Sequence, residues 1–375
     1  MYEHVTRFID DIKRVGFDRA GMLSDELTQA MYTPEIVDKD YRDTLDGYGL
    51  EGARPWGADI ESLDIKATLA TVTWVHRADH FVEGTMRCCL EDGFIYRILL
   101  RLRELDTGVA RPSQFGFWRE DEPLGCCSNW HPTGFDYRGT RFSTGEHWMM
   151  WQKARLMGDH EKADAILSAP TPRRAKEYGA EVKPYDGKLW DSVREQLVYY
   201  GVREKFLANN LERNLLLSTG SALLAEASPY DKVWGVGMTA DDPRFANPAK
   251  WEGENLLGRA CMRARADIRQ LCALGKLNGV CHEWPELDSC VGRMTLLQLS
   301  RMPSARAAVY CYATIVSHAL PHIYPTAGAY LKKEHDATVE GVTYSMQFNM
   351  GGGLPVVGWY ELVRELEIQH ALGRL

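Results

Sequence analysis

The sequence predicts an α+β protein that is predominantly helical and contains a few short strands. Over most of the chain, apolar residues recur every three or four positions, the spacing that places them on one face of a helix. Strand-like pieces are short, and they lie at residues 135–142, 223–238 and 342–350. Glycine and proline separate these stretches and mark the turns between them.

Length and composition place the chain among ordinary globular proteins. With 375 residues it is too long for one compact core, which predicts two or three domains. Apolar residues at 45% and charged residues at 26% exclude the disordered and fibrous classes. No apolar run approaches the length that spans a bilayer, and the N-terminus lacks the apolar centre of a signal peptide. We therefore expect a cytoplasmic protein without membrane contact.

The charge and the cysteines exclude two further classes. A net charge of −8 argues against a broad basic face for duplex nucleic acid. The nine cysteines show no C-x-x-C spacing and predict reduced thiols rather than a disulfide framework. Cys281, His282 and Cys290 lie close in sequence, but no second pair of ligands stands nearby. Neither a metal site nor a cofactor is therefore expected.

Residues 1–112 are expected to form a helical N-terminal domain of unknown role. Apolar periodicity predicts helices at residues 2–17, 62–81 and 90–105. Glycine and proline within residues 107–115 then mark a domain boundary.

Residues 113–275 and 276–375 form the second and third expected domains. The second contains the hairpin at 135–142 and a strand pair within 223–238. Its helices are predicted at residues 145–157, 159–168, 172–179, 189–209, 212–220 and 253–271. The third domain is a mixed helical region with a short strand pair. Its helices are predicted at residues 304–320 and 358–372.

The helix at residues 145–157 carries the strongest sign of a functional site. Two tryptophans and two methionines occupy four consecutive positions between Glu146 and Lys153. By helical periodicity, Glu146, Met150 and Lys153 fall near one face and could point into one cavity. A glutamate in the first turn is also favoured by the helix dipole, so a capping role for Glu146 is the alternative.

Other segments of the second domain hold side chains that a pocket would need. Asn129 offers an amide for a hydroxyl or carbonyl group. Glu226, Asp231 and Trp234 stand close together in sequence, beside glycines that would let a ligand approach the backbone. Asn255 lies in a second tryptophan- and glycine-containing segment. Each of these residues could equally belong to a solvated turn or to the core.

Several motifs of the second domain together resemble the NADAR family, which includes the YbiA-type N-glycosidases. The resemblance covers residues 113 to 272, and its motifs occur in the family's order. They read SNW, EHWMMWQKA, WDSVREQLVYYGVREKF, LLLSTG, EASPYDKVWGVGM and GENLLGRACMRAR. The resemblance implies a predominantly helical α+β domain that hydrolyses N-glycosidic bonds to ribose. Some members act on early riboflavin intermediates, and others remove ADP-ribose from guanine bases.

The resemblance also implies roles for individual residues. The acidic residue of the family's E-H motif falls on Glu146, the expected catalytic carboxylate, and the motif's lysine falls on Lys153. In this chain Val236 stands where some members, YbiA-type ones included, have aspartate, which disfavours the riboflavin reaction. The expected substrate-binding residues are Asn129, Trp148, Lys153, Trp190, Glu226, Asp231, Trp234, Gly235 and Asn255. The alternative role for each tryptophan is packing in the core.

Residues 77–103 resemble a small uncharacterised domain of bacterial proteins. We expect a helical packing or recognition module there, without a mechanism of its own.

The first interpretation of the whole chain is an N-glycosyl hydrolase. The resemblance implies removal of ADP-ribose from guanine in nucleotides or single-stranded nucleic acid. The oxocarbenium-like transition state of such a reaction would be stabilised by a carboxylate such as Glu146. Reversal of a toxin's modification implies an antitoxin or phage-conflict role, with a toxin partner encoded in the same operon. Two alternatives stay open: a sensor that binds ADP-ribose or NAD without turnover, and an N-glycosidase acting on riboflavin intermediates.

Overall fold

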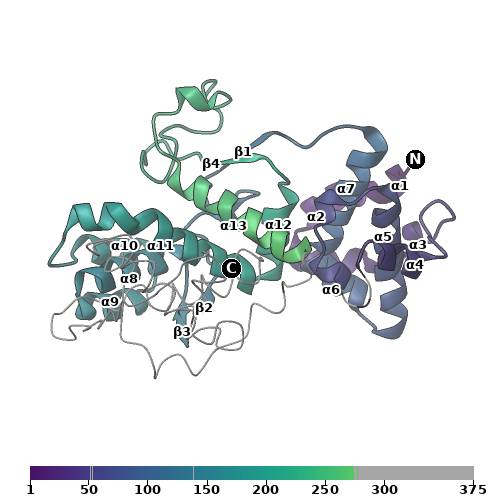
Figure 1. Cartoon of the computed structure of the whole chain (residues 1–375), viewed down its shortest axis with the longest axis horizontal. Helices are drawn as coiled ribbons and strands as arrows, with labels where there is room; N and C mark the ends of the chain where they lie inside the picture. The colour runs from purple at the N-terminus through teal and green to yellow at the C-terminus, as the bar shows by residue number, and fades with distance from the viewer. Residues whose placement is uncertain (51, 53, 138, 274–276, 278–375) are drawn as a thin grey trace, which may run out of the picture. The chain divides into compact units, whose positions relative to one another are not determined.

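The computed structural model describes residues 1–50, 52, 54–137, 139–273 and 277. Within them the protein is mainly helical with four short strands, which confirms the predicted α+β, predominantly helical class (Figure 1). The chain forms two compact units. The first combines Met1–Phe135 with Val202–Leu277, and the described part of the second is residues 136–137 and 139–201. These units cut across the three predicted domains, whose limits stay predictions.

The first unit begins with a group of helices packed around one apolar core (Figure 1). They are α1 (Glu3–Thr6), α2 (Phe8–Val15), η1 (Phe17–Leu23), α3 (Ser24–Met31), α4 (Tyr41–Gly47), η2 (Arg54–Gly57), η3 (Ile60–Ser62), α5 (Ile65–Phe81), α6 (Thr85–Glu91) and α7 (Phe94–Thr107). The helix predicted at 90–105 begins only at Phe94, because Gly93 has φ of 76° and separates α6 from α7.

The remainder of the first unit contains a two-stranded parallel sheet. Its elements are β1 (Gln114–Phe117), η4 (Gly125–Cys127), the end of α11 (Gly187–Ala208), α12 (Asn210–Ser218), β4 (Leu223–Glu226), η5 (Pro248–Lys250) and α13 (Leu256–Ala273). β1 pairs with β4 in a register that sets Gln114 beside Leu223 and Phe117 beside Glu226. The helix α13 packs against β4 (Figure 1).

The strand pair predicted within residues 223–238 is wrong. Only residues 223–226 form a strand, and the partner of that strand is β1. The stretch that follows is a turn-rich loop, in which the Asp231 carboxylate accepts backbone hydrogen bonds from Val233 and Trp234. A parallel partner far away in the chain leaves no local signal, whereas alternating apolar residues on both sides of a turn imitate a hairpin.

The second unit is built from short helices after a hairpin. The hairpin strands are β2 (Phe135–Tyr137) and β3 (Thr140–Phe142), as predicted. The helices are α8 (Gly145–Met157), α9 (His160–Leu167), α10 (Pro172–Ala180) and the first part of α11. Thr144, Asp159 and Thr171 accept a backbone N–H at the starts of α8, α9 and α10, which explains why these helices begin where predicted.

Several predictions fall on residues 278–375, which lie outside the described residues. They are the helices at 304–320 and 358–372, the strand at 342–350 and the Cys281, His282 and Cys290 cluster. Within the described part of the chain, no helix has both the length and the apolar character required to cross a membrane.

Candidate active site

Thr144 and His147 hold the start of α8. The backbone N–H of His147 donates to Thr144 Oγ1 at 3.3 Å, and the same oxygen lies 2.8 Å from His147 Nδ1. His147 Nε2 lies 3.0 Å from the carbonyl oxygen of Ala169. Because a carbonyl oxygen only accepts, Nε2 carries the proton and Nδ1 accepts from the threonine hydroxyl. Burial lowers the pKa of His147, so its neutral ring fixes the helix start.

Glu146 and Lys153 interact electrostatically on α8. Glu146 is 2% exposed in the first turn, where backbone amides and the helix dipole favour a negative charge. Burial lowers the pKa of the half-buried Lys153, and the negative charge of Glu146 opposes that shift. The Lys153 ammonium donates to the Gly179 carbonyl oxygen at 2.8 Å and lies 4.5 Å from the centroid of the Tyr185 ring. Glu146 and Lys153 therefore lie close enough to interact.

Met150 and Trp148 pack within the second unit. A Cβ atom on Gly179 would lie 2.0 Å from Met150 Sδ, so this methionine fills the space between α8 and α10. Trp148 is 1% exposed, and its indole N–H donates to the Leu197 carbonyl oxygen at 2.8 Å. The rings of Tyr137 and Phe142 meet it edge to face. This enclosed ring has the packing role that was the alternative to substrate binding.

The second predicted aromatic residue of this unit, Trp190, is also largely enclosed. It is 7% exposed near the start of α11. Trp151 of α8 remains half-buried, with its ring centroid 5.2 Å from that of Phe142 and 4.9 Å from the Arg155 guanidinium. Of the aromatic residues on α8, Trp151 is therefore the one that keeps accessible surface.

In the first unit, Asn255 joins the loop before α13 to strand β4. Its Oδ1 accepts from the backbone N–H of Glu226 at 3.0 Å, and its Nδ2 donates to the Leu224 carbonyl oxygen at 2.9 Å. It is 3% exposed and has φ of 55°, a conformation that asparagine tolerates better than most residues. Asn255 thus positions the carboxyl end of β4, where Glu226 stands.

The loop of Asp231, Trp234 and Gly235 lies against that same end of β4. The backbone N–H of Val236 donates to the Glu226 carbonyl oxygen at 2.9 Å. A Cβ atom on Gly235 would lie 2.8 Å from this oxygen, which explains the glycine. Asp231 Oδ1 receives the Trp234 N–H at 2.8 Å, so its carboxylate holds the turn. Trp234 is half-buried and keeps part of its surface accessible.

Sequence reasoning missed an aromatic pair at the same edge of the sheet. Trp118 directly follows β1, and Tyr230 lies shortly after β4, with their ring centroids 5.9 Å apart. The Arg119 guanidinium lies 4.9 Å from the Trp118 ring centroid, and Tyr230 is 87% exposed. Ligands of parallel sheets bind beyond the carboxyl ends of the strands. Because β1 and β4 are parallel, the residues after both strands reach one edge.

A second group that sequence reasoning missed is the buried charged run Arg203–Glu204–Lys205 on α11. Arg203 and Lys205 have no exposed surface, and Glu204 is 7% exposed. The Lys205 ammonium donates to the Ser128 carbonyl oxygen at 3.2 Å, next to the buried Asn129. The sequence could have revealed this group. Three consecutive charged residues between Val202 and Phe206 cannot all lie on the exposed face of one helix, so at least one of them had to be buried.

The structure thus brings most of the predicted residues together in two groups, to which Asn129, Trp148 and Trp190 do not belong. In the second unit, Glu146 and Lys153 share one environment. In the first unit, Glu226, Asp231, Trp234, Gly235 and Asn255 surround the carboxyl end of β4. No cluster of three or more His, Cys, Asp or Glu side chains suited to a metal ion occurs in the described part of the chain.

Two family models match the chain. The NADAR domain model matches residues 116–269, and the model of a family of unknown function, DUF6508, matches residues 21–107. The second match contains residues 77–103, which resembled an uncharacterised bacterial domain. The NADAR match contains Glu146 together with all the predicted substrate-binding residues.

Curated relatives match the same part of the chain. An N-glycosidase of Acanthamoeba polyphaga mimivirus is 35% identical over 148 residues, which make up 38% of this chain and 87% of the viral protein. N-glycosidase YbiA of Escherichia coli is 27% identical over 43% of this chain and 91% of its own length. A riboflavin biosynthesis protein of Vibrio vulnificus is 29% identical over 41% of this chain and 38% of its own length. The chain therefore belongs to the NADAR domain family.

Proposed function

We propose that this protein is an N-glycosyl hydrolase that removes ADP-ribose from guanine bases of nucleotides or single-stranded nucleic acid. The observation that carries the proposal is the buried Glu146 carboxylate at the start of α8, within electrostatic reach of Lys153. Two of the relatives described above are named N-glycosidases, which supports the reaction class.

Glu146 supplies the chemistry in this proposal. Cleavage of the bond between ribose and a base places positive charge on the anomeric carbon, and a preorganised carboxylate stabilises that charge. The same carboxylate takes a proton from the attacking water, whose hydroxyl bonds to the anomeric carbon. The carbon–nitrogen bond breaks, and the proton passes to the departing base nitrogen. A buried carboxylate is more effective than an exposed one, because its surroundings do not have to reorganise.

The remaining residues serve binding in this proposal. The half-buried Lys153 shares the environment of Glu146, and a cation there suits a diphosphate. The accessible rings of Trp118, Tyr230 and Trp234 suit stacking on a base, which is tolerant of base identity. A base within a duplex would first have to be unstacked, so nucleotides and single strands are the favoured substrates.

The decisive experiment is incubation of the purified chain with a guanine-ADP-ribosylated single-stranded oligonucleotide, followed by mass spectrometry. We expect release of free ADP-ribose and an unmodified guanine. Glu146→Gln should reduce the rate by about a thousandfold, because it removes both charge stabilisation and the proton acceptor. The matched control is Glu161→Gln, which neutralises an exposed glutamate in the first turn of α9.

The comparison separates catalysis from helix capping. If Glu146 only complements the dipole of α8, both variants lose a few tenths of a kcal/mol of stability and keep turnover. Equal turnover by Glu146→Gln and the parent would therefore remove Glu146 from the mechanism. Saturable ADP-ribose binding without any product would replace the hydrolase with a sensor.

One observation favours a second candidate reaction. The Vibrio vulnificus relative is named a riboflavin biosynthesis protein, and it matches the same part of the chain. An aminopyrimidine riboside phosphate of that pathway should therefore be tested beside the ADP-ribosylated oligonucleotide. Val236 is buried and fills the position at which some members have aspartate, so we expect the oligonucleotide to be the better substrate.

The biological role in this proposal is reversal of a toxin's modification. Expression of the chain should protect cells that express a guanine-ADP-ribosylating toxin, and Glu146→Gln should not protect them. Protection by the inactive variant would instead indicate that the chain neutralises the toxin by binding it.

A further inference from the structure

A pocket of about 510 Å³ lies within the first unit. Its walls come from η3, from α7 and the connection to β1, from the segment between α12 and β4, and from α13. The polar residues that line the pocket include Glu61, Arg101, Glu104, Arg111, Ser221 and Arg269. A volume of this size can hold a small metabolite.

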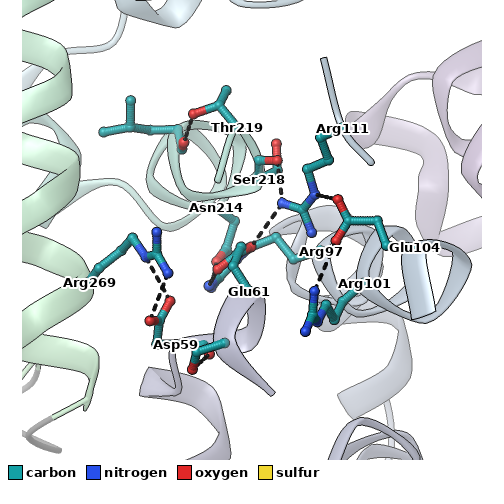
Figure 2. A network of polar contacts seen from close by, with 12 residues as sticks. Asp59, Glu61, Arg97, Arg101, Glu104, Arg111, Asn214, Ser218, Thr219 and Arg269 are labelled. Carbon is teal, nitrogen blue, oxygen red and sulfur yellow. Dashed lines mark hydrogen bonds and ion pairs between the residues drawn. The ribbon is translucent and has the colours of Figure 1, made fainter. Parts of the chain in front are cut away.

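Alternating charges form one wall of this pocket (Figure 2). Arg97 donates to both oxygens of Glu61, at 3.0 and 2.6 Å, and both side chains are almost completely buried. Arg111 lies 3.5 Å from Glu61 and 2.5 Å from Glu104, which also accepts from Arg101 at 3.4 Å. Three arginines thus share two carboxylates, and one positive charge stays uncompensated in this chain of contacts.

A second buried arginine, whose hydrogen-bond acceptors are uncharged, lies behind the pocket lining. Arg265 of α13 is 6% exposed and donates to Thr219 Oγ1 at 2.6 Å and to the Ala222 carbonyl oxygen at 2.7 Å. Both acceptors are neutral, and both residues line the pocket. Burial lowers the pKa of Arg265, whereas neighbouring Arg269 is paired with Asp59 at 2.9 Å. The whole network therefore holds five arginines against three carboxylates.

Arg111 also has hydrogen-bonding capacity to spare. Its Nη1 donates to the Ser218 carbonyl oxygen at 2.5 Å, and its Nε faces Glu104 (Figure 2). Its Nη2 is buried and has no hydrogen-bond partner among the residues that the structure describes. A buried guanidinium donor without an acceptor is costly, and an anion in the pocket would remove that cost.

We propose that this pocket binds the phosphate or diphosphate group of a small ligand. A doubly charged anion would balance the excess of arginines over carboxylates and accept from Arg111 Nη2, with Arg101 and Arg269 on the pocket surface. The exposed Ser221 stands at its rim. This binding does not depend on the proposed hydrolase reaction.

The pocket is separate from the predicted residues at the carboxyl end of β4. Ser113 and Ala222, which line it, immediately precede β1 and β4. Glu226, Trp118 and Tyr230 stand at or after the opposite ends of these strands. Four residues of strand span roughly 13 Å, so the two places are joined by the sheet but do not overlap. An anion here would act as an effector or as a structural ligand, away from the carboxyl ends of β1 and β4.

The test is a calorimetric titration of the full chain with inorganic phosphate, pyrophosphate and ADP-ribose at constant ionic strength. Saturable pyrophosphate binding is expected. Ser221→Glu places a negative charge at the rim without touching the network and should weaken binding about tenfold. Ser221→Gln is the neutral control of matched size and should bind as the parent does. Arg111→Met should abolish binding, and Ser221→Glu keeps the test valid if that variant fails to fold.

The competing outcomes are distinct. No saturable binding of any of the three ligands, or equal binding by Ser221→Glu and Ser221→Gln, overturns the proposal. Displacement of pyrophosphate by ADP-ribose assigns the site to the diphosphate of a nucleotide ligand, and independent binding assigns it to the free anion. The titrations are repeated with Glu146→Gln, so a failure of the proposed hydrolase does not affect their interpretation.

Discussion

The indole ring of Trp148 lies so close to Gly201 that a Cβ atom on this glycine would be 2.2 Å from the ring carbon Cδ1. Gly201 lies in the interior of α11, where glycine normally costs stability relative to alanine. One turn earlier on the same helix, the Leu197 carbonyl oxygen accepts the Trp148 N–H. The glycine is therefore required by the ring that packs on it, and α8 and α11 are joined through this contact.

Gly201→Ala should destabilise the protein by about 2 kcal/mol, because the rigid ring cannot move without losing its hydrogen bond. Gly187→Ala, in the same helix, meets only ordinary contacts with Tyr185 and should be neutral or slightly stabilising. Denaturant unfolding of both variants measures the difference. Equal stability of the two would mean that the contact between α8 and α11 is looser than described.

Asn255 serves both backbone conformation and hydrogen bonding, and two substitutions separate these roles. Asn255→Gly keeps the positive φ but loses both bonds to β4, which should cost about 1 to 2 kcal/mol. Asn255→Ala also strains the backbone and should cost roughly 1 kcal/mol more. Unfolding in urea ranks the two variants. An alanine variant as stable as the glycine variant would show that the positive φ is not needed.

Tyr230 should contribute to substrate binding and not to stability, because it is 87% exposed. If its ring and Trp118 stack on a base, Tyr230→Ala should raise KM about tenfold with little change in kcat. The control is Tyr32→Ala, which removes a 65% exposed tyrosine outside the NADAR match. Similar KM values for both variants would place the substrate elsewhere.

His147 should make stability depend on pH. Burial lowers its pKa below the usual 6.5, so below that pH the unfolded chain binds a proton that the folded chain does not. Its stabilising contribution is complete above pH 6.5 and is lost as pH falls through the folded-state pKa. The stability difference between the parent and His147→Gln should therefore narrow towards about pH 5. A difference that is the same at about pH 5 and about pH 8 would contradict this assignment.

Local signals determined the helices of the second unit and the position of Glu146. These signals are the threonine or aspartate before the starts of α8, α9 and α10, the proline after Thr171 and the apolar spacing. Each acts within one or two helical turns, so the helices can be predicted without the tertiary structure. The family motifs predict one site for Glu146 and Lys153, and the electrostatic interaction of these residues follows from their spacing on one helix.

Tertiary structure alone decided which side chains are enclosed and which strands pair. The partner of β4 is β1, and no short-range pattern encodes a parallel partner distant in the chain. Trp148 could have stacked on a ligand or filled the core, and it is the approach of α11, Tyr137 and Phe142 that encloses it. The same holds for Arg97 and Glu61, whose pairing depends on contacts between separate elements. Helix starts are determined by neighbouring residues, whereas burial and strand pairing depend on the path of the whole chain.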